Sequence, residues 1–318
     1  MDDFASGNLM SSNAESLGAL TTEGVNERSA QVDTLSPLEI VRLMNREDRL
    51  VIDAVAAAEA SIAAAVTAVV TSFRRGGRLI YMGAGTSGRL GVLDASECPP
   101  TFRTPPEMVV GIIAGGDGAL RRAVEGAEDS LELGAKDLKE LQVSDCDCVM
   151  GIASSGRTPY VIGGLDYARS VGATTLGLVC NRGSDMERLS DILICAVVGP
   201  EIISGSTRLK AGTATKMILN TITSAAMIQI GKTYGNLMVD VRASNAKLIA
   251  RSGRLVRMLT GLDDVAADRL LAHCDGCVKT AVVMHHRQVA ADAADTLLAE
   301  HGGRLRAVIG DVRIHEAS

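Results

Sequence analysis

The chain has 318 residues, of which 47% are hydrophobic and 22% are charged, and its formal net charge is −6. This balance excludes a disordered chain, and a chain of this length is expected to hold about two domains. It contains three Phe, four Tyr and no Trp. Single-stranded nucleic acid is bound by aromatic side chains along a basic groove. The composition and the negative charge therefore predict neither nucleic acid nor an anionic membrane surface as a partner.

The start of the chain and its uncharged runs predict a cytoplasmic protein. Met1-Asp2-Asp3 is unlike the basic start of a secretory signal. The longest uncharged runs, Ala60–Phe73 and Met217–Gly231, are shorter than the ~18–20 residues that a membrane span needs. Seven cysteines, an odd number, are expected to be reduced thiols. Cys274 and Cys277 form a CxxC without a second ligand pair at zinc-finger spacing, so we expect a helix there and no metal.

Residues 1–49 are predicted to form an N-terminal segment that ends in a helix. Ser36-Pro37-Leu38-Glu39 is typical of a helix start, with a Ser cap, Pro in the first position and Glu in the third. We expect a short helix over residues 37–48. A longer, alanine-rich helix is expected over residues 51–73, because Gly and Pro are absent there until Gly76.

Residues 50–240 alternate short apolar runs with helical stretches. The runs predicted to be strands are 79–82, 108–114, 148–153, 174–180 and 192–198. Strands that are apolar on both faces and separated by helices indicate a parallel sheet covered on both sides. We therefore predict a doubly wound, five-stranded α/β domain. One of its helices is expected to start near residue 117 and to run to about Leu141.

Residues 241–318 are predicted to form a small helical C-terminal region, because the strand pattern stops. The helices are expected over residues 244–260, 263–274, 277–285 and 289–301. Gly302-Gly303 is typical of a helix end.

Glycine- and hydroxyl-rich loops follow the predicted strands, at the sheet edge where open α/β domains bind ligands. Gly83-x-Gly85-x-x-Gly88 matches the dinucleotide-binding pattern only weakly, because no acidic residue ends the second strand. No Gly-Lys-Ser/Thr follows, which excludes a P-loop. Thr86 and Ser87 in the same loop carry hydroxyl groups suited to a terminal phosphate. A tight turn would explain the glycines but not these hydroxyls.

A second loop of this kind, Ser154-Ser155-Gly156-Arg157-Thr158-Pro159, follows the third strand. Thr158 can cap the next helix, with Pro159 in its first position. The hydroxyl groups and the N–H groups of that helix start favour a bound phosphate. A cap alone needs no ligand, but two hydroxyl-rich loops on adjacent strands favour phosphate binding. The loop Ser204–Lys210 adds further hydroxyls and two basic side chains.

These features together resemble the sugar isomerase (SIS) phosphosugar-binding domain. Six motifs in the same order narrow the resemblance to the N-acetylmuramic acid 6-phosphate etherase family. They lie at residues 20–26, 83–91, 94–101, 123–130, 155–160 and 235–240. The match runs from about Leu20 to Gly303, nearly the whole chain.

The resemblance implies a carbon–oxygen lyase of carbohydrate metabolism that acts on a small phosphosugar. The family cleaves N-acetylmuramic acid 6-phosphate to N-acetylglucosamine 6-phosphate and D-lactate, in amino-sugar (N-acetylmuramate) catabolism and peptidoglycan recycling. It further implies a cytoplasmic homodimer without metal or redox cofactor. In the open-chain sugar, the carbon 1 aldehyde acidifies the carbon 2 proton, so a base can remove it and lactate can leave from carbon 3. Such an elimination and rehydration needs proton-transfer groups and a firm hold on the phosphate.

Two glutamates match the family's catalytic positions. Glu97 precedes Pro99-Pro100, which are expected to stop its helix and to leave Glu97 near the phosphate loop. Burial there would raise its pKa and let it protonate the departing lactate. Glu128 is expected on the helix after the second strand, as the second acid/base. Spacing alone leaves Glu125 and Asp129 as equal candidates, and a solvated carboxylate is the alternative for each.

The predicted phosphate-binding residues share hydroxyl or backbone N–H groups at the two loops. They are Ser87, Gly88, Ser154, Ser155 and Thr158. Arg89 and Arg157 are further candidates, although each could pair with an acid instead. Glu201 and Lys210 are predicted pocket residues after the fifth strand.

Three other functions remain open at this point. A non-catalytic phosphosugar sensor would use the same domain, but such proteins usually add a DNA-binding helix-turn-helix or a second domain copy, and this sequence indicates neither. A sugar-phosphate aldose–ketose isomerase would also need a carboxylate base, so only the Glu97 and Glu128 motifs argue against it. A nicotinamide enzyme is the third alternative.

Overall fold

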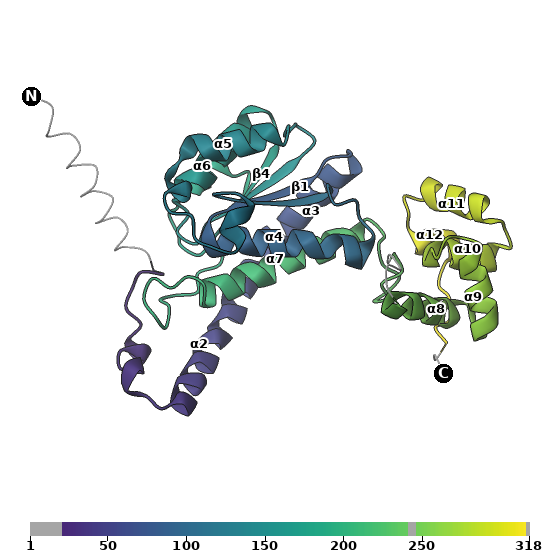
Figure 1. The fold of residues 1–318 in the computed structure, drawn as a ribbon, viewed down its shortest axis with the longest axis horizontal. Helices are drawn as coiled ribbons and strands as arrows, with labels where there is room; N and C mark the ends of the chain where they lie inside the picture. Colours follow the sequence, from purple (N-terminus) through teal and green to yellow (C-terminus); the bar gives the residue numbers. More distant parts are fainter. Residues whose placement is uncertain (1–20, 241–245, 316–318) are drawn as a thin grey trace, which may run out of the picture. The chain divides into compact units, whose positions relative to one another are not determined.

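The structure is a computed structural model that describes residues 21–240 and 246–315 (Figure 1). The described chain forms two compact units, and each is considered separately. The first consists of residues 21–95 and 109–222 and contains the sheet. The second consists of residues 96–108 and the described part of 223–318. The division into residues 1–49, 50–240 and 241–318 stays a prediction.

The five predicted strands form one parallel sheet in the order β2-β1-β3-β4-β5. Their bounds are β1 Leu79–Gly83, β2 Val109–Ile113, β3 Cys148–Ile152, β4 Thr174–Val179 and β5 Ile192–Cys195. The doubly wound, five-stranded fold is therefore confirmed. Because β1 pairs with both β2 and β3, the direction of winding reverses between β1 and β3. Gly83 pairs with Ile152 in the register, so the loops after β1 and β3 leave the sheet at the same level.

Helices cover both faces of the sheet (Figure 1). Helices α5 (Leu131–Glu140) and α6 (Pro159–Ser170) pack together on one face. Helices α3 (Glu59–Arg74), α4 (Gly85–Phe102) and α7 (Lys210–Gln229) lie on the other face. The strands supply side chains to both faces, and all five residues of β1 and of β3 are buried. Burial on both faces explains why these strands are continuous apolar runs.

The N-terminal residues contribute η1 (Glu27–Ser29), η2 (Val32–Thr34) and α2 (Pro37–Ala57). The predicted capping box between Ser36 and Glu39 is confirmed. The predicted break near residue 50 is wrong, because α2 continues to Ala57 and bends by 60° into α3. The buried stripe of α2 runs through the predicted break: Leu43, Glu47, Val51 and Ala54. Among the described residues, no single helix has the length and hydropathy to cross a membrane; the bent pair α2–α3 meets these criteria only when both helices are counted together.

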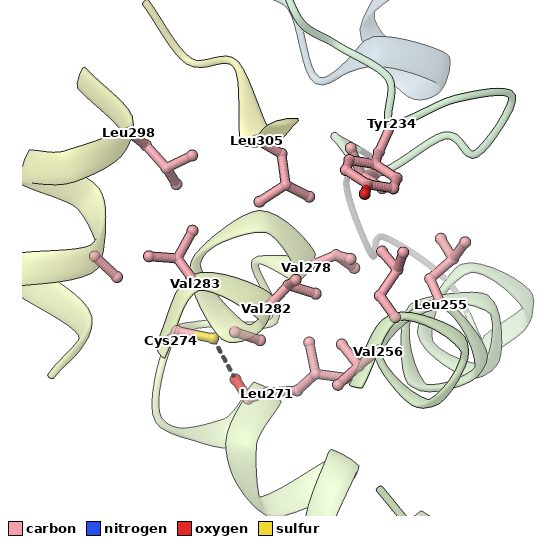
Figure 2. Packing of buried hydrophobic residues seen from close by; sticks show 14 of the residues in the cluster. Tyr234, Leu255, Val256, Leu271, Cys274, Val278, Val282, Val283, Leu298 and Leu305 are labelled. Atoms are coloured by element: carbon pink, nitrogen blue, oxygen red, sulfur yellow. Dashed lines mark hydrogen bonds between the residues drawn. The ribbon is translucent and has the colours of Figure 1, made fainter. Parts of the chain in front are cut away.

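The second unit contains the predicted small helical region. Its helices are α8 Ala246–Thr260, α9 Asp264–Ala272, α10 Val278–Arg287, α11 Ala291–Glu300 and α12 Leu305–Ile309. They enclose a core in which α10 is central, with Val278, Val282 and Val283 packed against α8, α9 and α11 (Figure 2). The expected helix start at 244 lies outside the described residues. Helix α12 was not predicted, because Gly302-Gly303 indicated an end.

The CxxC is a turn and not part of a helix. Cys274 and Cys277 flank Asp275 and Gly276, which both have positive φ angles and separate α9 from α10. The thiol of Cys274 is buried and donates to the carbonyl oxygen of Leu271 (Figure 2). Burial raises the pKa of this thiol to about 11.

Candidate active site

A pocket of about 920 Å³ lies in the first unit, where the loops after β1 and β3 emerge side by side. These loops contribute residues 84–87, 152–155 and 157–159. The rest of the lining comes from Thr22 and Glu23, from Glu128 and Asp129, and from Asp185 and Thr207. This is the switch point of the winding, where open α/β sheets bind ligands. The expected location of the site at this sheet edge agrees with the pocket.

The loop after β1 turns directly into α4. Gly85 has a φ of +51°, and Thr86 and Ser87 form the first turn of the helix beside the pocket. The first N–H groups of a helix have no partner within the helix, so this end suits an anion. A Cβ at Gly88 would lie 2.6 Å from the carbonyl oxygen of Gly83 and 2.6 Å from Ile113. Gly88, a predicted phosphate residue, therefore lets α4 pack closely against the strand ends.

The loop after β3 places a second helix end at the same pocket. Thr158 occupies the N-cap position of α6 and Pro159 the first position, as expected. The Thr158 hydroxyl makes no capping hydrogen bond. The Ser155 Oγ accepts a hydrogen bond from Arg157 N at 3.2 Å, which holds the turn. Ser154, Ser155, Arg157 and Thr158 all line the pocket.

The predicted helix over residues 117–141 is wrong. The segment contains η3 (Asp117–Leu120), η4 (Ala127–Asp129) and only then α5. Gly126 has a φ of +73°, and the Ser130 side chain accepts from Leu133 N at 3.1 Å to cap α5. Glu128 thus lies on a short turn, where it lines the pocket together with Asp129. Glu125 is not part of the lining, so the pocket distinguishes it from Glu128, which spacing alone could not do.

Glu97 differs from its expected local structure. Helix α4 continues through Pro99 and Pro100 to Phe102, and Arg103 N donates to Pro99 O at 3.0 Å beyond them. Pro99 and Pro100 have no N–H to donate to the carbonyl oxygens of Ala95 and Ser96, so the helix continues despite the loss of these two helical hydrogen bonds. Glu97 follows Ser87 by ten residues, roughly 15 Å of helix rise. Its side chain is exposed, so the expected burial is not found.

The predicted basic residues separate into two environments. Arg157 lines the pocket, whereas Arg89 donates to the carbonyl oxygens of Ala119 (2.7 Å) and Leu120 (3.1 Å) and holds η3 against α4. Lys210 is 1% exposed, and its Nζ lies 2.9 Å from Glu47 Oε2. Neither Arg89 nor Lys210 is among the residues that line the pocket.

Glu201 and Glu47 fix the start of α7 from two sides. The Glu201 carboxylate is buried and accepts from the backbone N–H groups of Lys210 (2.9 Å) and Ala211 (3.0 Å). Burial disfavours the ionised form of Glu47. Hydrogen bonds from Lys210 and Asn26, with the nearby positive charges, outweigh this cost and lower the pKa of Glu47. Lys210 and Glu201 thus belong to a buried polar network beneath the loop after β5.

Sequence analysis missed the contribution of the N-terminal segment to the pocket. Thr22 and Glu23 lie in the motif at residues 20–26, which indicated the family but suggested no site residue. That motif was the available signal, since a short polar stretch before the first helix has no periodicity that places it on the sheet edge. Thr207 belongs to the loop Ser204–Lys210, which the sequence indicated for its hydroxyls, whereas no motif pointed to Asp185.

The sheet order and the two hydroxyl-rich helix starts define an α/β protein of the SIS type. The SIS domain model matches residues 132–225, and that of the glucokinase regulatory protein N-terminal SIS domain matches residues 61–169. The chain is 59% identical to the N-acetylmuramic acid 6-phosphate etherase of Rhodopirellula baltica, covering 91% of this chain and 96% of the relative. It is 53% identical to N-acetylmuramic acid 6-phosphate etherase 1 of Vibrio cholerae, covering 92% and 98%. The chain therefore belongs to the N-acetylmuramic acid 6-phosphate etherase family, and the predicted resemblance is confirmed.

Solved structures of lower sequence identity match about three fifths of the chain. A phosphoheptose isomerase from Francisella tularensis is 20% identical with a TM-score of 0.47, covering 60% of this chain and all of that one. A putative sugar-phosphate isomerase from Listeria monocytogenes is 13% identical with a TM-score of 0.46, covering 62% and 93%.

Proposed function

We propose that this chain cleaves the D-lactyl ether of N-acetylmuramic acid 6-phosphate to give N-acetylglucosamine 6-phosphate and D-lactate. The observation that carries the proposal is the 59% identity to a named etherase over 91% of the chain. The pocket supports it independently, because it combines hydroxyl groups for a phosphate with carboxylates for proton transfer. Its volume of about 920 Å³ lies in the ordinary range for small-molecule sites.

The substrate phosphate is assigned to the starts of α4 and α6. The two helices contribute N–H groups and the positive ends of their dipoles. Ser87, Ser154, Ser155 and Thr158 add hydroxyl donors. Arg157 is the charged partner on the same lining. This assignment leaves the four carboxylates of the lining for the sugar.

The proposed reaction is an elimination followed by rehydration. The ring opens, and the carbon 1 aldehyde acidifies the proton on carbon 2. A carboxylate removes that proton, the carbon 3–oxygen bond breaks, and the lactate oxygen takes up a proton. Water then adds across the double bond, with its oxygen on carbon 3 and a proton on carbon 2. The atoms balance as a net hydrolysis, and carboxylates suffice as acid and base.

Glu128 and Glu97 are the proposed acid/base pair. Glu128 is supported by its place on the pocket lining. Glu97, the proposed acid for the departing lactate, is supported by its motif at residues 94–101. Family membership also supports a homodimer and a cytoplasmic role in peptidoglycan recycling, which we propose with the activity.

The test is D-lactate release from N-acetylmuramic acid 6-phosphate in water enriched in oxygen-18, with a chelator present. The expected products are unlabelled D-lactate and a sugar with oxygen-18 on carbon 3, located by the isotope shift of the carbon-13 resonance. In deuterium oxide, carbon 2 should acquire deuterium. Labelled lactate would contradict elimination, because it requires cleavage of the other carbon–oxygen bond.

A phosphosugar-binding regulator is the second candidate. The match of residues 61–169 to the glucokinase regulatory protein model favours it. Tight binding of the substrate without lactate release would support this function over the etherase. Conversion of an aldose phosphate to a ketose phosphate would instead support an isomerase.

A further inference from the structure

The segment from Thr21 to Ser29 supplies Thr22 and Glu23 to the pocket lining, and Asn181 holds its start in place. The Asn181 side chain is 1% exposed. Its amide oxygen accepts from Thr21 Oγ1 (2.8 Å) and from Thr22 N (3.3 Å). Its amide nitrogen donates to Thr22 Oγ1 (3.0 Å) and to Ser154 O (2.8 Å). One buried amide thus joins the N-terminal segment to the loop proposed to hold the phosphate.

The loop after β5 fixes the next residue, Glu23. Ser204 Oγ donates to the carbonyl oxygens of Glu23 (2.9 Å) and Gly24 (3.1 Å). Gly205 has a φ of +74°, and a Cβ there would lie 3.0 Å from Glu23 Oε2. The carboxylate therefore rests against the face of a glycine, in space that a side chain at that position would take.

The far end of the segment is also held by buried contacts. Asn26 Nδ2 donates to Glu47 Oε2 (2.8 Å), and Ser29 Oγ donates to Ile202 O (2.7 Å). Thr22, Asn26 and Ser29 are buried, whereas Glu23 is exposed and lines the pocket. The segment thus has an anchored face and one exposed acid, Glu23, that belongs to the pocket lining.

We infer that Glu23 is a substrate-contacting residue whose carboxylate accepts hydrogen bonds from the sugar part of the ligand. The inference rests on the proposed function, since it takes the ligand to be a phosphosugar. An ionised carboxylate only accepts hydrogen bonds and repels a phosphate dianion. Glu23 therefore suits the hydroxyl or amide N–H donors of the sugar and not the phosphate. Hydrogen bonds to a charged group are the stronger kind, so its loss should cost about tenfold or more in affinity.

The test compares Glu23→Gln with the matched control Glu27→Gln. Glu27 is an exposed acid on the same segment that is not part of the pocket lining. The ligands are N-acetylglucosamine 6-phosphate and inorganic phosphate, with dissociation constants from isothermal titration calorimetry and folding checked by circular dichroism. Glu23→Gln should bind the phosphosugar about tenfold or more weakly and bind inorganic phosphate as well as the unmodified protein does. Glu27→Gln should match the unmodified protein for both ligands.

Ser204→Ala provides a second test of the placement of Glu23. Removing its hydroxyl should weaken phosphosugar binding in the native background and have no further effect in the Glu23→Gln background. Ser204→Thr, which keeps the hydroxyl, should restore the native affinity. If the losses of phosphosugar affinity caused by Ser204→Ala and Glu23→Gln simply added in the double variant, Ser204 would not act by positioning Glu23.

Two results would overturn the inference. One is an affinity of Glu23→Gln for the phosphosugar within twofold of that of the unmodified protein. The other is an equal loss of affinity for inorganic phosphate, which would mean a change in the whole pocket. Because these measurements use the reaction product, they do not require turnover. A protein that binds the product but releases no lactate contradicts the etherase proposal alone, and one that binds neither ligand overturns both proposals.

Discussion

Lys210 and Glu47 form an ion pair in which each side chain is only 1% exposed and Nζ lies 2.9 Å from Oε2. The pair connects α2 with the start of α7, and Glu201 caps the same helix start. A charge buried this deeply is strongly destabilising without its partner. The pair therefore holds the N-terminal helix to the loop that carries Ser204 and Thr207.

Lys210→Met should destabilise the first unit by about 3–5 kcal/mol, because it leaves the Glu47 carboxylate buried without its ammonium partner. The free energy of unfolding from urea denaturation measures this change. Lys136→Met is the matched control, since Lys136 is exposed and 3.7 Å from an exposed Glu140. It should change stability by less than about 1 kcal/mol. A loss as small for Lys210→Met would contradict the structural role of the buried pair.

The ionised carboxylate of Asp147 stabilises the folded protein, and this stabilisation is lost when the pH falls. Burial opposes its ionisation. The hydrogen bonds from Arg78 and the Ser144 backbone, with the Arg78 charge, outweigh this and lower the pKa of Asp147 below 3.8. A lowered native pKa stabilises the fold fully above the unfolded pKa, and the contribution disappears as the pH falls through the native pKa. We expect the unfolding free energy to fall from about pH 5 downward. Asp147→Asn should reduce this slope in urea titrations, and an unchanged slope would exclude Asp147 as a major source.

Glu128→Gln should lower kcat for lactate release by about 10²- to 10⁴-fold, because a general acid or base contributes that factor. Glu125→Gln is the control, an exposed acid three residues away that is not part of the pocket lining. It should keep its activity. If Asp129→Asn, and not Glu128→Gln, loses activity, the proton transfer belongs to Asp129.

Glu97→Gln should give a folded protein that binds N-acetylglucosamine 6-phosphate and has almost no turnover. The exposed side chain makes a folding defect unexpected. Lactate assays and calorimetry with the product separate loss of chemistry from loss of binding. Normal turnover in this variant would remove Glu97 from the mechanism.

Gly88→Ala should destabilise the protein by about 1–3 kcal/mol, because the new methyl group meets backbone and the Ile113 side chain. Gly118 is the matched control, since a Cβ there meets nothing within 4 Å. Thermal unfolding of Gly88→Ala and Gly118→Ala measures the difference. If Gly88→Ala were as stable as Gly118→Ala but no longer bound phosphate, Gly88 would act in ligand binding and not in packing.

The parallel sheet and its covering helices could be predicted because each strand and helix has a recognisable pattern in its own stretch of sequence. The apolar runs are separated by stretches long enough to form helices. A parallel sheet covered by helices on both faces buries all of these runs. The prediction of one helix from residue 117 to about Leu141 failed between Asp117 and Ser130, because Gly126 takes a positive φ and the helix begins only after its N-cap, Ser130. The predicted helix stop at Pro99 and Pro100 was also wrong, because the loss of two N–H donors did not end the helix, which continues to Phe102.

From local sequence features the pocket lining was predictable where a helix start defines it, whereas Glu128 was selected by its family motif. Ser87 and Thr158 could be placed because strand ends of a parallel sheet meet at one edge. Glu23 could not, since its position depends on Asn181 and Gly205, both far away in the sequence. The sequence likewise placed Glu201 and Lys210 after a strand, but tertiary packing decides whether they face a ligand or join a buried polar network.

The attachment of Thr22 to Asn181 has a consequence for biosynthesis. The hydrogen-bonded residues are separated by 159 positions, so the wall of the pocket closes a very long loop. Closing such a loop is entropically costly until the sheet that receives it exists. On the ribosome, the N-terminal segment has to wait for β4 and for the loop at Ser204 and Gly205. A nascent chain that ends before Gly205 has no complete pocket, so a bound ligand cannot stabilise its fold.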